Sequence, residues 1–469
     1  MDHLPYIPHY SVGAACSLTF VRIMSAGEPF SLIGIIRHLV PSVLQVFGIV
    51  LIALAGFLVA MLVASHIASR SNKTVEWSRW VEFHDKSLVK KYGNQRVPIS
   101  DFIDDYISKK VSLKVDVRSL FTKHRNDLFR FCFTLSHVKF VLQTLLPQGM
   151  THDQRMDVGE VKWVYDRGND FYRAFLGPMM IYTSAIFKSY GESLEDAQRN
   201  KLDLVCQKIQ LKPKEKLLDI GCGWGTLGIH ASKFFQADVT GVSISKEQLD
   251  WARTRAKEAG ANTVEYKLMD YRDIPKTKYN KITCLEMAEH VGVKNFPAFM
   301  KQVYDMLEEE GIFYLQIAGL RRAWQFEDLI WGVFMGTWIF PAADASLPLA
   351  WSVNQLECAG FEVQSHENIG IHYSETISRW LTNCEKNKDK IIAKYGEKWY
   401  RIWLVFLAWS VVVAAQGSST CHMIVAYKNK NSFDRKRFVG AVSSGAPHTR
   451  AVVEKPNLTL FPSDKFGAF

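Results

Sequence analysis

Three glycines and an acidic residue lie close together near the middle of the chain, in the segment LLDIGCGWG. Gly221, Gly223 and Gly225 carry no Cβ, so the backbone there can approach a ligand closely. Their spacing is GxGxG, whereas a phosphate-binding fingerprint reads GxGxxG, and Asp219 precedes the first glycine. The pattern favours a cofactor with a cationic amino-acid end, such as S-adenosylmethionine, over a pyrophosphate. A glycine-rich structural turn is the alternative interpretation.

Polar residues that follow the next two strand-like segments are candidate contacts for the same cofactor. Dinucleotide sites often have an acidic ribose ligand after the second strand. The segment GVSISKEQ has none there, which leaves Ser243 and Gln248. Ser245 and Gln248 also form an S-x-x-Q capping box, so a structural role for Gln248 stays open. In LMDYRD, Asp270 and Tyr271 could hold an adenine ring by hydrogen bonding and packing, or they could form a surface turn.

Strands and helices alternate around these residues. The near-continuously apolar strands predict an α/β fold with a mostly parallel sheet covered on both faces, which binds ligands beyond the carboxyl ends of its strands. Ser193 is a candidate cap for a helix over 193–211 that precedes the sheet. The expected strands are 216–221, 238–244, 264–269, 281–288, 312–319 and 420–427, and the expected helices are 225–235, 246–260 and 296–311.

The composition excludes some classes of partner. The net charge is +10 over 469 residues, 48% of them apolar, and no basic stripe with interleaved aromatics occurs. This charge fits an anionic membrane surface better than nucleic acid. Eight cysteines are scattered without a CxxC pair or a His/Cys ligand spacing. We therefore expect a reducing compartment, no nucleic acid and no bound metal.

A long uncharged segment near the amino terminus predicts a membrane anchor. No Asp, Glu, Lys or Arg occurs over 40–68, and 42–64 alone is long enough to cross a bilayer as a helix. A buried helix is the alternative, and the short apolar stretch 31–36 leaves a second pass open. Basic residues are denser after the segment than before it, so the positive-inside rule places everything downstream in the cytosol.

These patterns divide the chain into five parts. We expect an extension over 1–31, a transmembrane segment over 32–70 and a flexible tail over 431–469. The basic and aromatic region 71–150 is expected to form helices, which lie near the bilayer surface or pack on the catalytic domain. That domain is expected over 151–430.

Two apolar stretches inside the domain expected over 151–430 are further candidates for contact with the membrane. The tryptophan-rich stretch 326–349 fits either a membrane-facing entry for acyl chains or core helices. In the stretch 399–421, Arg401 and Gln416 bound an apolar run that is too short to span a bilayer. We therefore predict a core helix there.

Five segments in order, YDRGNDFY, YTSAIF, LLDIGCGWG, EMAEHVG and HYSETISRW, resemble the cyclopropane-fatty-acid synthase family of S-adenosylmethionine enzymes. FLGPMMIYTSAIF, KITCLEMAEHVGV, FEDLIWG and IFPAADAS are more closely similar to the eukaryotic sphingolipid carbon-9 methyltransferases. The resemblance covers about residues 160 to 430 and implies a class I S-adenosylmethionine methyltransferase fold, which is Rossmann-like.

The resemblance also implies a reaction and a location. The enzyme would methylate carbon 9 of the 8,9 double bond of a ceramide's sphingoid base, in glucosylceramide biosynthesis. It would be held in a membrane, by default the endoplasmic reticulum, with its catalytic domain facing the cytosol. The alternative is a cyclopropane-forming or methylating enzyme that acts on unsaturated phospholipid acyl chains.

The family motifs assign roles to individual residues. Glu289 maps onto an active-site glutamate that provides negative charge, Tyr373 onto an active-site tyrosine, and Tyr165 onto a segment that closes over the cofactor. Each of these tyrosines, and Tyr182, could alternatively be an ordinary core residue. His290 is expected to be a packing residue. Attack by an alkene leaves a carbocation, so the site must exclude water, stabilise positive charge and offer a base. The expected cofactor contacts are Tyr182, Thr183, Asp219, Gly221, Gly223, Trp224, Gly225, Ser243, Ile244, Gln248, Asp270 and Tyr271.

Two positions depart from the bacterial members of that family. The bacterial synthases hold a bicarbonate ion, taken as the base, with a cysteine, a histidine, the glutamate and the tyrosine. Here Ser184 replaces the cysteine and Gln316 the histidine, so we expect both among the catalytic residues but a different proton acceptor. Loss of a proton from the new methyl closes a cyclopropane, whereas loss from the chain leaves a methyl-branched alkene. The closer resemblance favours the branch.

Overall fold

The computed structural model describes residues 17–18, 32–145, 159, 165, 167–341 and 347–428. The expected tail over 431–469 and nearly all of the expected extension over 1–31 lie outside the described residues. The chain divides into two compact units. One comprises Met1–Arg70 and Phe131–Val138, and the other comprises Ser71–Arg130 and Lys139–Phe469.

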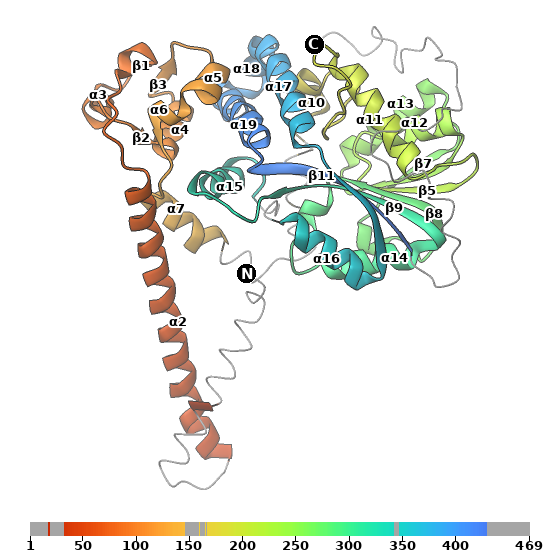
Figure 1. Ribbon diagram of the computed structural model, residues 1–469, viewed down its shortest axis with the longest axis horizontal. Helices are drawn as coiled ribbons and strands as arrows, with labels where there is room; N and C mark the ends of the chain where they lie inside the picture. The colour runs from red at the N-terminus through yellow and green to blue at the C-terminus, as the bar shows by residue number, and fades with distance from the viewer. Residues whose placement is uncertain are drawn as a thin grey trace. The chain divides into compact units, whose positions relative to one another are not determined.

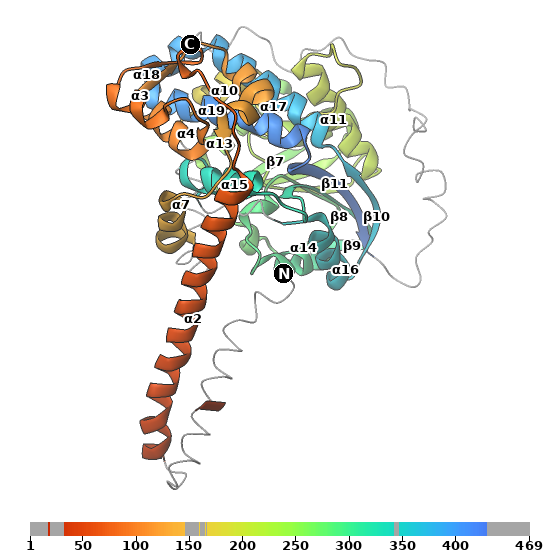
Figure 2. The same cartoon turned by 60° about the vertical axis from the view of Figure 1, so that its left-hand side comes forward.

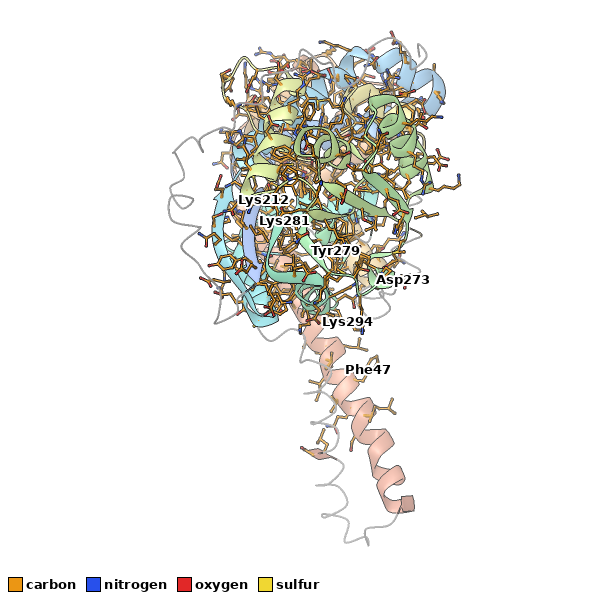
Figure 3. All side chains as sticks on the ribbon, turned by 90° about the vertical axis from the view of Figure 1, so that its right-hand side faces the viewer. Phe47, Lys212, Asp273, Tyr279, Lys281 and Lys294 are labelled. Carbon is orange, nitrogen blue, oxygen red and sulfur yellow. The ribbon has the colours of Figure 1, made fainter. Side chains whose placement is uncertain are left out.

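The first unit contains one long helix, α2 (Leu32–Ala68). Its stretch Ser42–Ala68 has a mean hydropathy of 3.0 and is almost entirely unburied, and Phe47 is 59% exposed (Figure 3). At 1.5 Å per residue, 27 residues extend about 40 Å, which exceeds the hydrocarbon thickness of a bilayer. α2 is therefore a candidate membrane span. Residues 32–36, considered for a second pass, belong to the same helix.

Residues Phe131–Val138 are hydrogen-bonded to the carboxyl-terminal end of α2. The Phe133 N–H donates to Ser65 Oγ at 3.0 Å, and a ring nitrogen of His66 lies 3.0 Å from the Phe133 carbonyl oxygen. These contacts explain why Phe131–Val138 belongs to the first unit although it is distant in sequence.

The second unit is built on a seven-stranded sheet with the order β10-β11-β9-β8-β5-β6-β7 (Figure 1). Neighbouring strands from β9 to β7 pair in parallel, while β11 pairs antiparallel with both β9 and β10. All six expected strands are present, and β10 is an additional one. The bounds are β5 (Lys216–Ile220), β6 (Asp238–Ser243), β7 (Val264–Leu268), β8 (Tyr279–Leu285), β9 (Leu307–Leu320), β10 (Phe361–Asn368) and β11 (Ser419–Lys428).

Helices cover both faces of this sheet (Figures 1 and 2). Leu217 packs in a core cluster with α11, α12 and α13, and the next residue, Leu218, packs in a second cluster with α14 and α16. Burial on both faces explains why the strands lack polar alternation. The bounds are α11 (Leu194–Lys208), α12 (Thr226–Phe235), α13 (Lys246–Ala259), α14 (Phe296–Met306) and α16 (Leu349–Ala359).

Local signals set the ends of three of these helices. Ser193 Oγ accepts the Asp196 N–H at 3.1 Å, which confirms Ser193 as the cap of α11, and Ser245 caps α13. The expected helix over 296–311 is too long. It ends at Met306 because Leu307 already pairs with Tyr279 at the start of β9.

Within the second unit, residues 71–130 pack on the part of the chain that contains the sheet. Arg401 in α19 (Glu397–Ala415) donates to the carbonyl oxygens of Tyr106 at 2.7 Å and Val111 at 2.8 Å. This packing is the second of the two arrangements considered for that region. α19 is buried over most of its length, which confirms the core helix predicted at 399–421. The elements of the region are η2 (Trp77–Arg79), β1 (Val81–Phe83), α3 (Lys86–Tyr92), β2 (Val97–Pro98), α4 (Ile99–Ile107), β3 (Val111–Leu113), α5 (Val117–Ser119), η3 (Leu120–His124), α6 (Arg125–Leu128) and β4 (Phe129–Arg130), followed by α7 (Leu135–Phe140) and η4 (Val141–Leu145).

Candidate active site

A cavity of about 160 Å³ lies at the carboxyl ends of β5, β6, β7 and β8, the edge predicted to bind a ligand. Eleven of the twelve residues predicted to contact the cofactor line it, and Gly225 is the exception. The predicted catalytic residues are not among its lining residues. Two of them, Ser184 and Gln316, instead contact Glu286, which does line the cavity.

The glycines of the turn over 221–225 differ in whether a Cβ would find space, as Gly223 and Gly225 show. All three glycines have left-handed φ angles, of 77°, 52° and 78° in chain order. A Cβ on Gly223 would meet no atom within 4 Å, so the cavity side of this residue is open to a ligand. A Cβ on Gly225 would lie 2.6 Å from the Tyr266 ring and 2.7 Å from Ala252. Packing, rather than a ligand, therefore accounts for the glycine at position 225.

Asp219 forms the acidic part of the cavity at the end of β5. It accepts a hydrogen bond from Thr283 Oγ1 at 2.9 Å, and burial raises its pKa to about 6. Lys201 on α11 also lines the cavity and donates to Thr183 Oγ1 at 2.8 Å. Burial lowers the pKa of Lys201 to about 8, although the charges of Glu286 and Asp219 oppose this shift. The sequence analysis did not single out Lys201, since buried lysines are rare.

The polar residues after β6 and β7 are already partly engaged by their neighbours. Ser243 Oγ donates to Gln248 Oε1 at 3.1 Å, so Gln248 has a structural partner and also lines the cavity. Asp270 accepts the Arg272 N–H at 2.9 Å at the start of η5 (Tyr271–Asp273), and Tyr271 packs its ring 4.9 Å from Phe299. Ser245 accepts the Gln248 N–H, which is half of the expected capping box, and Asp270 begins a turn. All four candidate residues also line the cavity, and their contact with a ligand stays a prediction.

Aromatic rings form one wall of the cavity. Tyr165 lies 6.3 Å from Tyr182 and 6.4 Å from Trp224, measured between ring centroids. The ring of His290 lies 6.3 Å from Tyr165 and 5.8 Å from Phe340, as a packing residue would. Such a wall excludes water and presents ring faces that attract positive charge.

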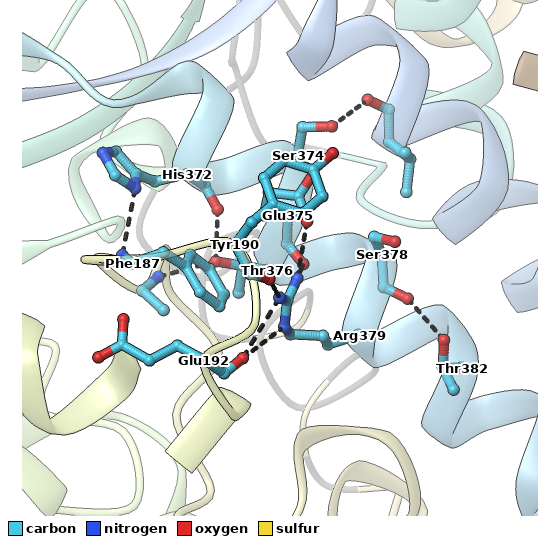
Figure 4. Close-up of polar contacts among 12 residues, drawn as sticks. Phe187, Tyr190, Glu192, His372, Ser374, Glu375, Thr376, Ser378, Arg379 and Thr382 are labelled. Atoms are coloured by element: carbon cyan, nitrogen blue, oxygen red, sulfur yellow. Dashed lines mark hydrogen bonds and ion pairs between the residues drawn. The ribbon is translucent and has the colours of Figure 1, made fainter. Parts of the chain in front are cut away.

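The loop that follows Ser184 is held by α17 (Gly370–Lys386), and Figure 4 shows its contacts at Phe187 and Glu192. Thr376 Oγ1 accepts the Ala185 N–H at 2.9 Å, and His372 Nδ1 accepts the Phe187 N–H at 3.2 Å. Farther along the loop, Arg379 donates to the carbonyl oxygens of Tyr190 at 3.0 Å and Glu192 at 3.3 Å and lies 4.2 Å above the Phe187 ring. These contacts fix the backbone of Ser184, which is fully buried.

Glu289 is a buried carboxyl group with one unsatisfied oxygen. It lies in η6 (Ala288–His290), where Oε1 accepts the Ala318 N–H at 2.5 Å and Oε2 has no hydrogen-bond partner among the described residues. Burial, followed by the charge of Glu286, raises the pKa of Glu289 to about 7. An orphaned carboxylate oxygen beside a cavity is a group that a cationic ligand or intermediate can satisfy.

A second carboxyl group, Glu286, was missed by the sequence analysis. Its Oε1 accepts hydrogen bonds from the Ser184 N–H at 2.8 Å, from Gln316 Nε2 at 2.6 Å and from the Cys421 thiol at 3.5 Å. The signal that could have revealed Glu286 is an acidic residue at the ligand-binding end of an apolar strand.

Tyr373 is affected by the same carboxyl groups. Burial and the charges of Glu286, Cys421 and Glu289 raise the pKa of Tyr373 well above its usual range.

The arrangement fits a cationic cofactor. Four carboxyl groups lie in or near the cavity, from Asp219, Asp270, Glu286 and Glu289, against the two cations of Lys201 and Arg272, and Arg272 is paired with Asp270 at 3.1 Å. S-adenosylmethionine carries a sulfonium and an amino group, which suit this charge, and open space at Gly223 leaves room for its backbone contact. The residues present therefore fit the predicted cofactor.

Comparison with known proteins identifies relatives. Residues 152–424 match the family model described as mycolic acid cyclopropane synthetase. A sphingolipid C9-methyltransferase of Komagataella phaffii is 44% identical over 412 residues, 84% of this chain and 84% of that protein. Sphingolipid C9-methyltransferase 1 of Gibberella zeae is 46% identical over 384 residues, 80% of this chain and 75% of that protein.

Solved structures share the fold. The mycolic acid cyclopropane synthase CmaA1, complexed with SAH and CTAB, matches with a TM-score of 0.54 and 24% identity. The match covers 58% of this chain and 98% of that chain. At this identity the likeness concerns the fold alone, and it confirms the predicted class of α/β domain.

Proposed function

The chain belongs to the mycolic acid cyclopropane synthetase family and, within it, to the sphingolipid C9-methyltransferases, and from this membership we propose its reaction. It transfers a methyl group from S-adenosylmethionine to carbon 9 of the 8,9 double bond of a ceramide's sphingoid base, in glucosylceramide biosynthesis. The observation that carries the proposal is the cavity at the strand ends, which is lined by eleven predicted cofactor contacts and by Glu286, with Glu289 next in sequence to the lining residue His290.

The residues around the cavity suit this chemistry. When bound, S-adenosylmethionine supplies an electrophilic methyl group on a positively charged sulfur. Tyr165, Tyr182 and Trp224 exclude water and place aromatic faces near positive charge. Glu289 holds a negative charge that stabilises the carbocation left on the lipid chain, since one of its oxygens is not already hydrogen-bonded within the described part of the chain.

Incubation of the purified full-length enzyme with labelled S-adenosylmethionine and defined ceramides tests the proposal. We expect label in the sphingoid base when the ceramide carries an 8,9 double bond and none when that bond is saturated. Mass spectrometry of the released long-chain base gives the readout. Unsaturated phospholipids are offered in a parallel reaction. Label in their acyl chains, and none in the sphingoid base, would favour the phospholipid as the substrate.

We further propose that α2 anchors the enzyme in the endoplasmic reticulum membrane, with the second unit in the cytosol. The support is the apolar, unburied surface of Ser42–Ala68 and the basic residues that follow it. A ceramide substrate resides in the bilayer and the methyl donor in the cytosol, so an anchor would hold the enzyme at the boundary. Fluorescence protease protection on tagged full-length protein would test the orientation.

Deletion of residues 1 to 70 removes α2 and tests whether this helix is needed for methylation of lipid in a membrane but not for cofactor binding or for the chemical step. We expect the truncated protein to bind S-adenosylhomocysteine as the full chain does, because the second unit contains the whole cavity. Methylation of ceramide in vesicles should fall at least about tenfold, since anchoring raises the effective concentration of the substrate. Methylation of a short-chain ceramide in detergent serves as the control and should be retained. Full activity on vesicles would show that residues 71–150 suffice for docking.

A further inference from the structure

The Glu286 carboxylate is fixed in one orientation by its neighbours. Tyr314 Oη donates to Gln316 Oε1 at 3.1 Å, so the Gln316 amide must present its Nε2 hydrogens to Glu286. The Glu286 N–H in turn donates to the Gln316 carbonyl oxygen at 2.7 Å. Glu286 has a φ of 52°, in the left-handed region that favours glycine. A non-glycine residue retained there is a reason to look for a function of its side chain.

One oxygen of this carboxylate is held while the other is open. All three donors to Glu286 meet Oε1, and no donor among the described residues meets Oε2. Glu286 also lines the cavity in which the cofactor contacts converge. The second oxygen is therefore available to a ligand or to a reacting group in the cavity.

The donors to Glu286 occupy two positions already singled out by sequence. Ser184 and Gln316 stand where the bacterial synthases have the cysteine and the histidine that hold bicarbonate. The Gln316 side-chain amide and the Ser184 backbone N–H both donate to Glu286 Oε1, while the Ser184 hydroxyl donates to the Ala185 carbonyl oxygen. A carboxylate and a bicarbonate ion present the same pair of oxygens on one carbon. The Glu286 carboxylate therefore already accepts hydrogen bonds from both of these positions.

We propose that Glu286 is the general base of the reaction and that its carboxylate replaces the bicarbonate ion of the bacterial synthases. The inference rests on the proposed function for the identity of the lipid, but the assignment of the base can be tested on whichever lipid is methylated. It assigns different roles to the two glutamates: Glu289 contributes charge and Glu286 accepts a proton.

The proposed step balances without a further reactant. The π electrons of the 8,9 double bond form the new bond from carbon 9 to the methyl carbon, and the sulfur–methyl bond breaks with its electrons left on sulfur. Carbon 8 is then a cation. Glu286 Oε2 takes the proton from carbon 9, and the electrons of that C–H bond re-form the double bond. The products are a methyl-branched alkene, a neutral thioether and a protonated Glu286, which returns its proton to water.

The surroundings of Glu286 favour this role. Burial raises the pKa of Glu286, while its hydrogen bonds from Ser184 and Gln316 and the charge of Lys201 act in the opposite direction. A carboxylate with a raised pKa is a stronger proton acceptor.

The test combines Glu286→Gly with addition of small anions. Glycine suits the left-handed backbone at this position, so we expect the variant to keep its melting temperature and its affinity for S-adenosylhomocysteine. Turnover should fall at least about 100-fold, as for loss of a general base. Bicarbonate or formate at high concentration should restore turnover at least about tenfold by filling the vacated space. The wild-type enzyme should be insensitive to bicarbonate.

A matched control and a second variant complete the experiment. Glu310 is an exposed glutamate with a φ of 63°, so Glu310→Gly makes the same backbone change away from the site and should leave turnover and bicarbonate sensitivity unchanged. If Glu286→Gly does not fold, Glu286→Gln keeps the size of the side chain and should lose turnover without rescue.

Several results would overturn the inference: full turnover of either Glu286 variant, no rescue of a folded Glu286→Gly protein, or a wild-type enzyme that stalls without bicarbonate. Both sphingoid bases and phospholipid acyl chains are scored in every reaction. A wild-type enzyme that methylates only acyl chains would contradict the proposed substrate, while rescue of Glu286→Gly on that product would still support the base.

Discussion

Replacement of Glu289 by glutamine should lower kcat by about 100- to 1,000-fold, the range seen when one positioned electrostatic group is removed. The amide keeps the size of the side chain and can still accept the Ala318 N–H through its oxygen. It removes the negative charge that we assign to stabilisation of the carbocation. Affinity for S-adenosylhomocysteine, measured by titration calorimetry, should change little, because this product lacks the sulfonium charge.

The same variant should change the pH dependence and the stability of the enzyme. Glu289 has a folded-state pKa of about 7, above its usual value of 4.5, so its carboxylate form is lost as the pH falls below about 7. We expect the wild-type kcat/KM to fall there, and the residual kcat/KM of the variant to keep only the pH dependence of the remaining carboxyl groups, Asp219 and Glu286. A raised carboxyl pKa stabilises the fold at low pH, and this contribution is lost as the pH rises through 7. The variant should therefore melt at a higher temperature than the wild type above pH 7.

Glu327→Gln is the matched control for Glu289→Gln. Glu327 is also a buried glutamate, but it pairs with Arg125 at 3.1 Å and accepts a hydrogen bond from Trp409 Nε1, away from the cavity. Its variant should lose stability and keep kcat. Retained kcat in Glu289→Gln would remove Glu289 from the chemical step.

Gly223→Val should abolish measurable binding of S-adenosylhomocysteine, with a loss of affinity of at least about 100-fold. A Cβ at this position meets no protein atom within 4 Å, so the new side chain projects into the space that we assign to the cofactor. Titration calorimetry on the detergent-solubilised variant measures the effect.

A variant at a second glycine, Gly260, serves as the control that distinguishes the effect of backbone strain from the loss of cofactor contact. Gly260 ends α13 with a φ of 67°, and a Cβ there would also meet no atom within 4 Å, but Gly260 does not line the cavity. Gly260→Val should therefore lower the melting temperature about as much as Gly223→Val does. It should bind S-adenosylhomocysteine with the wild-type affinity. Equal affinities in the two variants would exclude the glycine turn from the binding site.

Much of the cofactor site could be predicted from sequence because its residues lie in short contiguous segments. Asp219, Gly221 and Gly223 lie at or just after the end of one strand, and Ser243 and Asp270 lie at the ends of the next two. In a parallel sheet the carboxyl ends of neighbouring strands meet at one edge, so strand order alone brings these segments together. The same logic predicted the helices that cover the sheet and the cap at Ser193.

The catalytic end of the cavity could not be predicted in the same way. The three donors to Glu286 come from Ser184, Gln316 and Cys421, which are 102, 30 and 135 residues away in sequence. Nothing local to any of these residues signals the other two. Sequence identified Ser184 and Gln316 only as departures from a family pattern, and the folded chain brings the Ser184 backbone and the Gln316 side chain to the Glu286 carboxylate.

The buried helix α19 has a consequence for the order in which the protein is made. Arg401 on this helix bonds the carbonyl oxygen of Tyr106, which is 295 residues earlier in the chain. During synthesis, residues 71–130 therefore leave the ribosome long before the helix on which they pack, and they must wait with that surface uncovered. α19 is also long and apolar enough to pass for a second membrane span. A long apolar helix that is made late must therefore pack quickly against residues 71–130 and the sheet, because its uncovered surface favours aggregation until it is buried.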